Sequence, residues 1–132
     1  MNRFEVVKIK NNEYYSLVDS ATKEELVHLT VEKNPFNRHN RNITSFPYEG
    51  SIYYLCDFIT STRHRGNGYG RKLLNYVVEN TKGKFIYLIV CSSSKHMGNR
   101  ALVNFYKSVG FKVHNKKFGL YKYLTWMVLD NR

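Results

Sequence analysis

Residues 58–74 of the chain read Phe58-Ile-Thr-Ser-Thr-Arg-His-Arg-Gly-Asn-Gly-Tyr-Gly-Arg-Lys-Leu-Leu74 and lead from a predicted strand into a predicted helix. Three glycines alternate here, at positions 66, 68 and 70. Glycine lets the backbone approach a ligand closely, and the first N–H groups of a helix have no partner within it. The glycines, these N–H groups and the helix dipole together predict a binding site for a phosphate or pyrophosphate. Arg65, Arg71 and Lys72 add positive charge to it. The alternative interpretation is a tight strand-to-helix turn that binds nothing.

Two common phosphate-binding motifs are excluded by the same stretch. A dinucleotide fingerprint needs a third glycine where this chain has Arg71, and the following strand carries no acid for a ribose. A nucleoside-triphosphate loop needs Gly-Lys-Ser or Gly-Lys-Thr, and neither triplet occurs in the sequence.

The residues around this loop predict alternating strands and helices. β-Branched and aromatic residues favour strands, and apolar residues at helical spacing followed by glycine favour helices that end there. The pattern predicts a strand over 52–60, a helix from about 68 to 80, a buried strand over 85–91, a helix from about 99 to 109 and strands near 111–115 and 121–129. This order predicts an α/β fold with a mixed sheet.

The N-terminal part of the chain is less regular. Residues 4–10 alternate as a strand does. Residues 13–29 are interpreted as a helix, whole or broken in two, because Thr22 and Glu25 match a capping box before Leu26. Residues 33–50 contain both prolines and many asparagines, which favours a loop with at most a short strand.

Composition places the chain among compact domains. Of its 132 residues 42% are apolar, without repeats or linkers, so one domain over 1–132 is expected. No apolar run approaches the ~20 residues that span a bilayer, and the N-terminus lacks a secretory pattern, so we expect a cytoplasmic protein without a membrane segment. Cys56 and Cys91 are too few for a disulfide framework and are expected as reduced core thiols, and the five histidines show no metal-ligand spacing.

The charge is unevenly spread along the chain. Residues 1–79 carry a net charge of +2 and residues 80–132 a net charge of +9, with no carboxylate between Glu79 and Asp130. Such a field favours anionic partners, nucleic acid among them, and repels polyamines and aminoglycosides. The alternative is a basic surface that serves only solubility.

Two motifs in order resemble the GNAT superfamily of N-acetyltransferases. The first is Arg65-x-x-Gly68-x-Gly70, which enters a helix with Leu73 and Leu74 and is similar to the loop that binds the acyl-CoA pyrophosphate. The second is Asn99-Arg-Ala-Leu-Val-Asn-Phe-Tyr-Lys-Ser-Val-Gly-Phe111, which is similar to the family's second signature helix. The resemblance covers residues 50–129 and implies a GNAT-like fold, with a central mixed sheet, splayed parallel strands and flanking helices.

The resemblance also implies which residues contact acetyl-CoA. The backbone amides of the loop would bind the pyrophosphate, the strand before it would bond the pantetheine arm through its backbone, and the first residue of the second helix would touch pantetheine. These residues are Arg65, Gly66, Asn67, Gly68, Tyr69 and Gly70 in the loop, Phe58, Ile59 and Thr60 in the strand, and Asn99 in the helix.

Tyr106 would act as the acid that protonates the departing CoA thiolate, since a tyrosine hydroxyl stays protonated at neutral pH. Packing beside Phe105 is the alternative. Many members of the family place a glutamate on one of the two splayed strands to deprotonate the amine, and this chain has none there. Asp57 is the candidate base, although regular alternation puts it on the face opposite Phe58, and Glu49 and His64 are weaker candidates. His96 borders the site or lies in an exposed loop.

The resemblance therefore implies an enzyme that transfers an acetyl group from acetyl-CoA to a primary amine, with a protein amine as the first hypothesis. An RNA-borne amine, such as that of an aminoacyl-tRNA, is the second hypothesis. The third is an inactive GNAT-like module that binds nucleic acid through its basic half. The missing glutamate favours an amine of low pKa over a lysine side chain, because an α-amine titrates near ~8 and a lysine near ~10.4.

Overall fold

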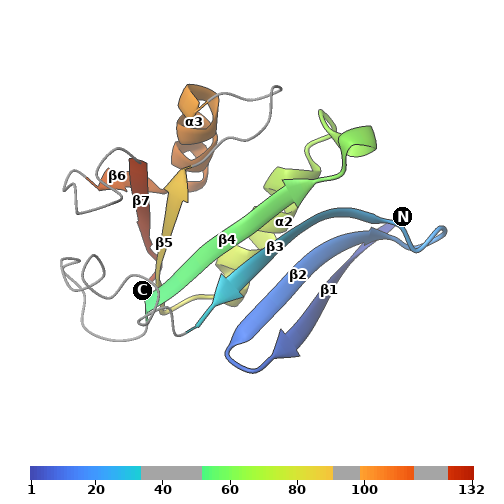
Figure 1. The fold of residues 1–132 in the computed structure, drawn as a ribbon, viewed down its shortest axis with the longest axis horizontal. Coiled ribbons are helices and arrows are strands. Elements are labelled where there is room, and N and C mark those ends of the chain that lie inside the picture. Colours follow the sequence, from blue (N-terminus) through green and yellow to red (C-terminus); the bar gives the residue numbers. More distant parts are fainter. Residues whose placement is uncertain (34–51, 91–98, 115–124) are drawn as a thin grey trace.

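The fold is that of a computed structural model, which describes residues 1–33, 52–90, 99–114 and 125–132 as a mixed sheet with two α-helices (Figure 1). The strands are β1 (Asn2–Ile9), β2 (Asn12–Asp19), β3 (Glu25–Glu32), β4 (Ile52–Thr60), β5 (Phe85–Val90), β6 (Lys112–His114) and β7 (Thr125–Asp130). The helices are α2 (Tyr69–Asn80) and α3 (Asn99–Val109), with a short 3₁₀ turn, η1 (Thr62–His64), before α2. None of the helices described is both long and apolar enough to cross a lipid bilayer.

The seven strands form one sheet in the order β1-β2-β3-β4-β5-β7-β6. Only β4 and β5 pair in parallel, and α2 connects them. All other neighbouring strands pair antiparallel. The mixed sheet confirms the predicted fold class, and β4 and α2 lie where the sequence predicts them.

The predicted helix over 13–29 is wrong, because these residues form β2, a turn and β3. The turn is fixed by Asp19, whose Oδ1 accepts hydrogen bonds from the backbone N–H groups of Ala21 at 2.9 Å and Thr22 at 3.3 Å. Thr22 does not cap a helix; its Oγ1 accepts a hydrogen bond from the Glu24 N–H within the turn. An Asp side chain that accepts a hydrogen bond from the backbone two residues further on stabilises a turn. At Asp19 this turn forms in place of the helix that the apolar pattern predicts.

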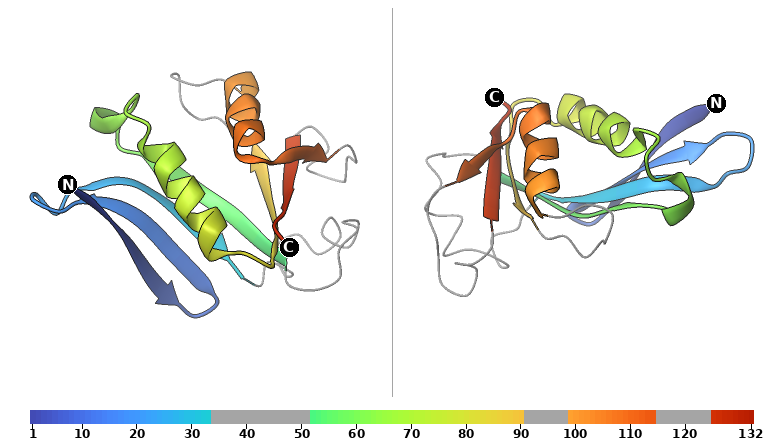
Figure 2. Two further views of the ribbon diagram at one scale, coloured as in Figure 1. Left: turned by 180° about the vertical axis from the view of Figure 1, so that it is seen from behind. Right: turned by 90° about the horizontal axis from the view of Figure 1, so that it is seen from above.

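Both helices pack on the same face of the sheet (Figure 2). Leu73, Leu74 and Val77 of α2 are fully buried against β2, β3 and β4, and Tyr106 of α3 belongs to the same core. The helices contact each other as well. The starts of α2 and α3, where orphan N–H groups lie, therefore belong to one side of the sheet.

An aromatic stack lies on the other face of the central strands. The rings of Tyr54 and Tyr87 are stacked with centroids 4.8 Å apart, and Tyr87 stacks on Trp126 at 5.7 Å. Tyr87 and Trp126 are fully buried. Because β5 contributes to the core on one face and to this stack on the other, it is buried on both faces as its continuous apolar run predicts.

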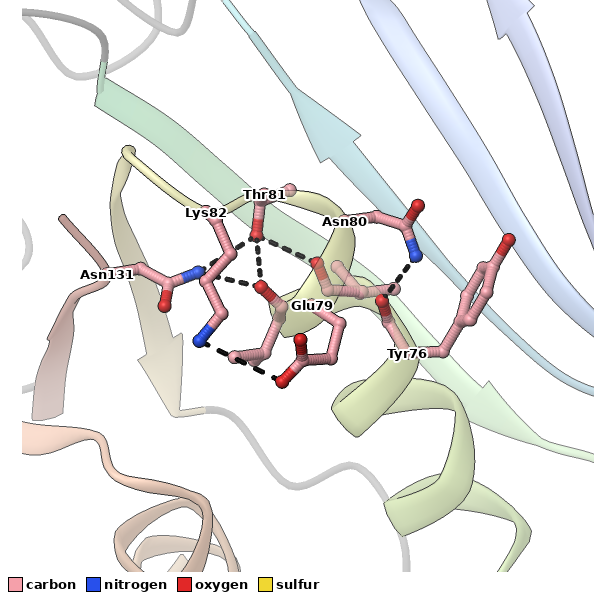
Figure 3. Close-up of polar contacts among 8 residues, drawn as sticks. Tyr76, Glu79, Asn80, Thr81, Lys82 and Asn131 are labelled. Carbon is pink, nitrogen blue, oxygen red and sulfur yellow. Dashed lines mark hydrogen bonds and ion pairs between the residues drawn. The ribbon is translucent and has the colours of Figure 1, made fainter.

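The C-terminal end of α2 is tied to the end of β7 (Figure 3). Asn131 donates from Nδ2 to the Val78 carbonyl at 2.7 Å, and Thr81 donates from Oγ1 to the Val77 carbonyl at 2.8 Å. The backbone of Asn131 also accepts from Gly83 N and donates to the Lys84 carbonyl. These bonds satisfy carbonyls that a helix end leaves without partners, and they fix α2 relative to the sheet.

Candidate active site

Strands β4 and β5 separate after a short paired segment (Figure 1). Pairing runs from Ile52 opposite Phe85 to Tyr54 opposite Tyr87, and no further pair is formed within the described residues, although both strands continue. Among the described residues, the edge of β4 that faces β5 therefore has no pair with β5 beyond Tyr54. An unpaired edge of this kind can bind an extended ligand through N–H and C=O groups.

A β-bulge in β4 sets which side chains face the helices. Thr30 of β3 pairs with Cys56 and His28 pairs with Ile59, so β4 has one extra residue here, and Asp57 adopts a left-handed φ of 53°. Regular alternation would put Leu55 and Phe58 on opposite faces. The bulge instead lets both join the core beneath the helices, and it leaves Asp57 exposed.

The glycine loop has the backbone geometry of an anion-binding turn. Gly66 and Gly68 have φ values of 84° and 76°, while Asn67 between them does not have a positive φ. A Cβ added at either glycine would meet no atom within 4 Å, so the space beside the loop is open. Gly68 is the N-cap of α2, and its carbonyl accepts the first helical bond from Lys72 N. When left-handed and right-handed backbone conformations alternate at the start of a helix, successive N–H groups point toward one position, which can bind an anion.

The third glycine serves packing. A Cβ at Gly70 would lie 3.5 Å from the Phe58 ring and 3.6 Å from Thr60 Oγ1. The first turn of α2 thus rests directly on the end of β4. The loop is in this way held beside the unpaired edge of that strand.

Tyr106 lies on α3 among aromatic rings. Its ring centroid is 6.4 Å from that of Phe58, 5.4 Å from Phe105 and 5.7 Å from Phe111. Tyr106 is 7% exposed, and burial raises the pKa of its hydroxyl to about 12. The hydroxyl is therefore protonated at neutral pH, as a proton donor must be. Its packing among these rings and a role as acid are compatible.

The predicted base residues are in different surroundings. Asp57 is exposed at the bulge. His64 lies beside a carboxylate, with its Nε2 3.1 Å from Glu24 Oε1. Glu49 and His96 lie outside the described residues.

Glu32 is a carboxylate that the sequence analysis missed. It is the register partner of Tyr54 across β3 and β4, and its Oε1 accepts a hydrogen bond from Cys56 Sγ at 3.9 Å. The wrong helix over 13–29 hid it, because only a strand places Glu32 beside β4.

Basic side chains surround the loop on the helix side. The Arg71 guanidinium lies over the Phe105 ring at 5.2 Å, and Lys72 Nζ lies 6.0 Å from the centre of the Tyr69 ring. Arg100 and Lys107 are exposed on α3. Helices α2 and α3 together carry these four basic residues and one carboxylate, Glu79, so the two helices have a net positive charge.

The structure thus brings the predicted residues of the strand, the loop and α3 to one side of the molecule. Phe58 contacts both α3 and the start of α2. Asn99 is the first residue of α3, but its side chain lies outside the described part of the chain. Cys56 is half-buried with its Sγ donating to Glu32 Oε1, and Cys91 lies outside the described residues. No cluster of three or more histidine, cysteine or acidic side chains suited to a metal occurs among the residues described.

Comparison with protein families gives one match: the acetyltransferase (GNAT) domain aligns with residues 24–113. The aligned region includes β3, β4, the glycine loop, both helices and β5. No curated protein sequence matches the chain significantly.

Solved structures with the same fold include three acetyltransferases of low sequence identity. NAA60 from Arabidopsis thaliana, in complex with a bisubstrate analogue, has a TM-score of 0.63 at 17% identity, covering 92% of this chain and 78% of its own. The ribosomal-protein-S18-alanine N-acetyltransferase from Escherichia coli has a TM-score of 0.62 at 14% identity, with 92% and 70% covered. An aminoglycoside 6′-N-acetyltransferase complexed with coenzyme A has a TM-score of 0.59 at 17% identity, with 90% and 72% covered.

Proposed function

The chain belongs to the GNAT family of acetyltransferases, and we propose that it transfers the acetyl group of acetyl-CoA to the α-amine of a polypeptide. N-acetyl transfer from acetyl-CoA is the reaction of this family. The observation that supports the proposal is the separation of β4 from β5 beside a glycine loop of anion-binding geometry and a protonated tyrosine.

Acetyl-CoA would lie along the unpaired edge of β4. Its pyrophosphate would bind the backbone N–H groups of residues 65–70 at the start of α2, where the helix dipole favours negative charge. Its pantetheine amides would bond the backbone of Phe58, Ile59 and Thr60, as an added strand does. Asn99, at the start of α3, would contact the same arm. The thioester would then lie toward the end at which β4 and β5 are still paired, near Cys56 and Asp57.

The reaction joins the acceptor nitrogen to the acetyl carbon and breaks the bond from that carbon to sulfur. The neutral amine attacks the thioester carbonyl, and backbone N–H groups on β4 stabilise the oxyanion. Tyr106 donates its proton to the departing thiolate. The proton that the amine loses goes to a carboxylate, for which Asp57 is one candidate and Glu32 the other.

These two carboxylates differ in their surroundings. Asp57 lies at the bulge itself, where its side chain is exposed. Glu32 is partly buried and hydrogen-bonded to Cys56, at the level where β4 and β5 begin to separate. Glu32 and Tyr54 are register partners, and Tyr54 stacks on Tyr87 on the face opposite the helices. An acceptor that approaches from that face would meet Glu32, while acetyl-CoA occupies the helix side.

The α-amine is favoured over a lysine side chain because it titrates near ~8 and needs less help to become neutral. The name of one structural neighbour fits a polypeptide acceptor, because that enzyme acetylates an alanine of ribosomal protein S18.

An RNA-borne amine is the second candidate, and the excess of basic over acidic residues on α2 and α3 favours it. Exposed Arg100 and Lys107 on α3 could contact phosphates. An inactive member of the family that only binds nucleic acid would use the same surface.

Labelled acetyl-CoA incubated with the purified protein and a cell extract separates these functions. We expect acid-stable label in the protein fraction and an equal amount of free CoA thiol. Label confined to RNA would support the second candidate. Salt-sensitive RNA binding without turnover for any acceptor class would contradict the enzymatic proposal altogether.

A further inference from the structure

We infer that Glu24 and His64 form a clamp between the β2–β3 turn and the glycine loop, and that Glu24 is a positioning residue for acetyl-CoA. The inference rests on the part of the proposed function that places the CoA pyrophosphate at this loop. It does not depend on which amine is the acceptor.

The first half of the clamp is a turn that holds Glu24 in a fixed position. Asp19 bonds the backbone of Ala21 and Thr22, and these bonds lower the pKa of its carboxyl. The turn is closed further by bonds from Lys23 N to the Asp19 carbonyl and from Asp19 N to the Glu24 carbonyl. Lys23 has a left-handed φ of 65°. A turn with this many internal bonds presents the Glu24 carboxylate with little freedom of its own.

The second half is the close contact between the two side chains, which becomes an ion pair when the imidazole is protonated. Glu24 Oε1 lies 3.1 Å from His64 Nε2 and 3.4 Å from Arg63 Nη1. The side chains of His64 and Glu24 are 18% and 34% exposed, whereas that of Arg63 is 78% exposed. The pair with His64 is therefore the better shielded of the two, and the contact with Arg63 is a weak surface pair.

His64 in turn contacts the glycine loop. Its backbone carbonyl accepts a hydrogen bond from Asn67 Nδ2 at 3.1 Å, and its N–H donates to the Ser61 carbonyl at 2.9 Å. The His64 ring also meets the ring of Tyr69, the first residue of α2, with centroids 6.1 Å apart. Gly66 thus lies between His64 and Asn67, and Gly68 lies between Asn67 and Tyr69, the two loop residues that His64 contacts.

The loop needs such an anchor because its two glycines carry little conformational preference. Ordering a glycine-containing loop when a ligand binds costs conformational entropy, and a loop already held in its binding geometry avoids part of that cost. The clamp would therefore act on the affinity for acetyl-CoA. It would leave the acetyl transfer step itself unchanged, since the Glu24 side chain contacts Arg63 and His64 and the His64 ring contacts Tyr69.

The test is a double-mutant cycle on the affinity for CoA, measured by titration calorimetry with Glu24→Ala, His64→Ala and the double variant. We expect each single variant to bind CoA about three- to tenfold more weakly, and the double variant to be no weaker than the weaker single variant. His64→Gln retains an N–H donor and should recover part of the affinity. At saturating acetyl-CoA, the kcat of Glu24→Ala should match the wild type while its KM for acetyl-CoA rises.

Glu25→Ala is the matched control. Glu25 is in the same hairpin, where it accepts a hydrogen bond from Tyr14 and lies 3.0 Å from His28 Nδ1, and neither contact involves the loop. Thermal unfolding checks that all variants are folded. Wild-type CoA affinity in folded Glu24→Ala, strictly additive losses, or an equal loss in Glu25→Ala would each overturn the clamp.

The outcomes separate this inference from the proposed function. A wild-type protein that binds CoA with the expected cycle but acetylates no polypeptide supports the clamp and contradicts the acceptor. A wild-type protein that does not bind CoA overturns both.

Discussion

The ring of Tyr106 on α3 lies 6.4 Å from the ring of Phe58 on β4, directly after the bulge at Asp57. This contact joins the candidate acid to the strand along which acetyl-CoA is proposed to lie. Replacing Tyr106 with Phe keeps the ring and its packing and removes only the proton donor. We expect folded Tyr106→Phe to bind CoA normally and to turn over about 100-fold more slowly. Steady-state kinetics with calorimetry measure both, and wild-type turnover would reduce Tyr106 to a packing residue.

The dependence of kcat on pH is a second test of Tyr106. Burial raises the pKa of Tyr106 to about 12. An acid is active below its pKa, so raising that pKa keeps the donor protonated and preserves activity through alkaline pH. We expect kcat to rise with pH as the amine and its base lose protons, and then to stay level to about pH 10. A decrease above about pH 9 that disappears in Tyr106→Phe would keep Tyr106 as the acid and contradict its raised pKa, whereas a decrease that persists in Tyr106→Phe would assign the acid to another group.

Gly68 offers a pair of variants that differ only in charge. At a φ of 76° with no atom within 4 Å of an added Cβ, both Asn and Asp fit the left-handed conformation better than other residues do. Gly68→Asp places a negative charge at the proposed pyrophosphate site, and we expect it to weaken CoA binding at least about tenfold relative to Gly68→Asn. Equal affinities of the two variants for CoA would show that no phosphate lies at this loop.

The base is tested by comparing two carboxylates on or beside β4. Glu32→Gln and Asp57→Asn each remove one negative charge at nearly constant volume. Because Glu32 is partly buried beside Cys56 and Asp57 is exposed, we expect the larger loss of kcat at neutral pH in Glu32→Gln, with a smaller loss at higher pH where the amine is already neutral. A loss confined to Asp57→Asn would instead assign the base to the bulge.

Asn131 tests how α2 is attached to the sheet. Its buried amide bonds the Val78 carbonyl and Thr81 Oγ1 at the end of α2 that lies away from the glycine loop (Figure 3). We expect Asn131→Ala to lower the free energy of unfolding by about 1–2 kcal/mol, with unchanged affinity for CoA. Asn80→Ala, which removes an exposed bond to the Tyr76 carbonyl, is the control and should cost less than about 0.5 kcal/mol. Urea unfolding in which both variants lose equal stability would contradict the role of Asn131.

The sequence predicts the central part of the fold because local signals and tertiary structure agree there. β4 over Ile52–Thr60 has β-branched and aromatic residues, and Gly83 and Gly110 mark helix ends with φ values of 85° and 117°. The continuous apolar run of β5 matches a strand buried on both faces. Alternation and glycine placement are local properties, so they can be read without knowledge of neighbours.

The N-terminal hairpin and the base could not be predicted in the same way. Residues 13–29 have enough apolar residues for either a helix or two strands, and pairing with β1 and β4 decides between them. The bulge at Asp57 changes which side chains share a face, and alternation alone cannot locate it. Glu32 and Glu24 acquire their candidate roles only through contacts with Cys56 and His64, which are 24 and 40 positions further along the chain.

The central claim is that this chain acetylates polypeptide α-amines with acetyl-CoA. The most direct measurement is mass spectrometry of peptides with free N-termini and lysines, after incubation with acetyl-CoA and either the wild-type protein or Gly68→Asp. We expect one acetyl group on the α-amine per CoA thiol released, with the wild type only. Acetylation confined to lysine side chains, or no acetylation by a wild-type protein that binds acetyl-CoA, would contradict the claim.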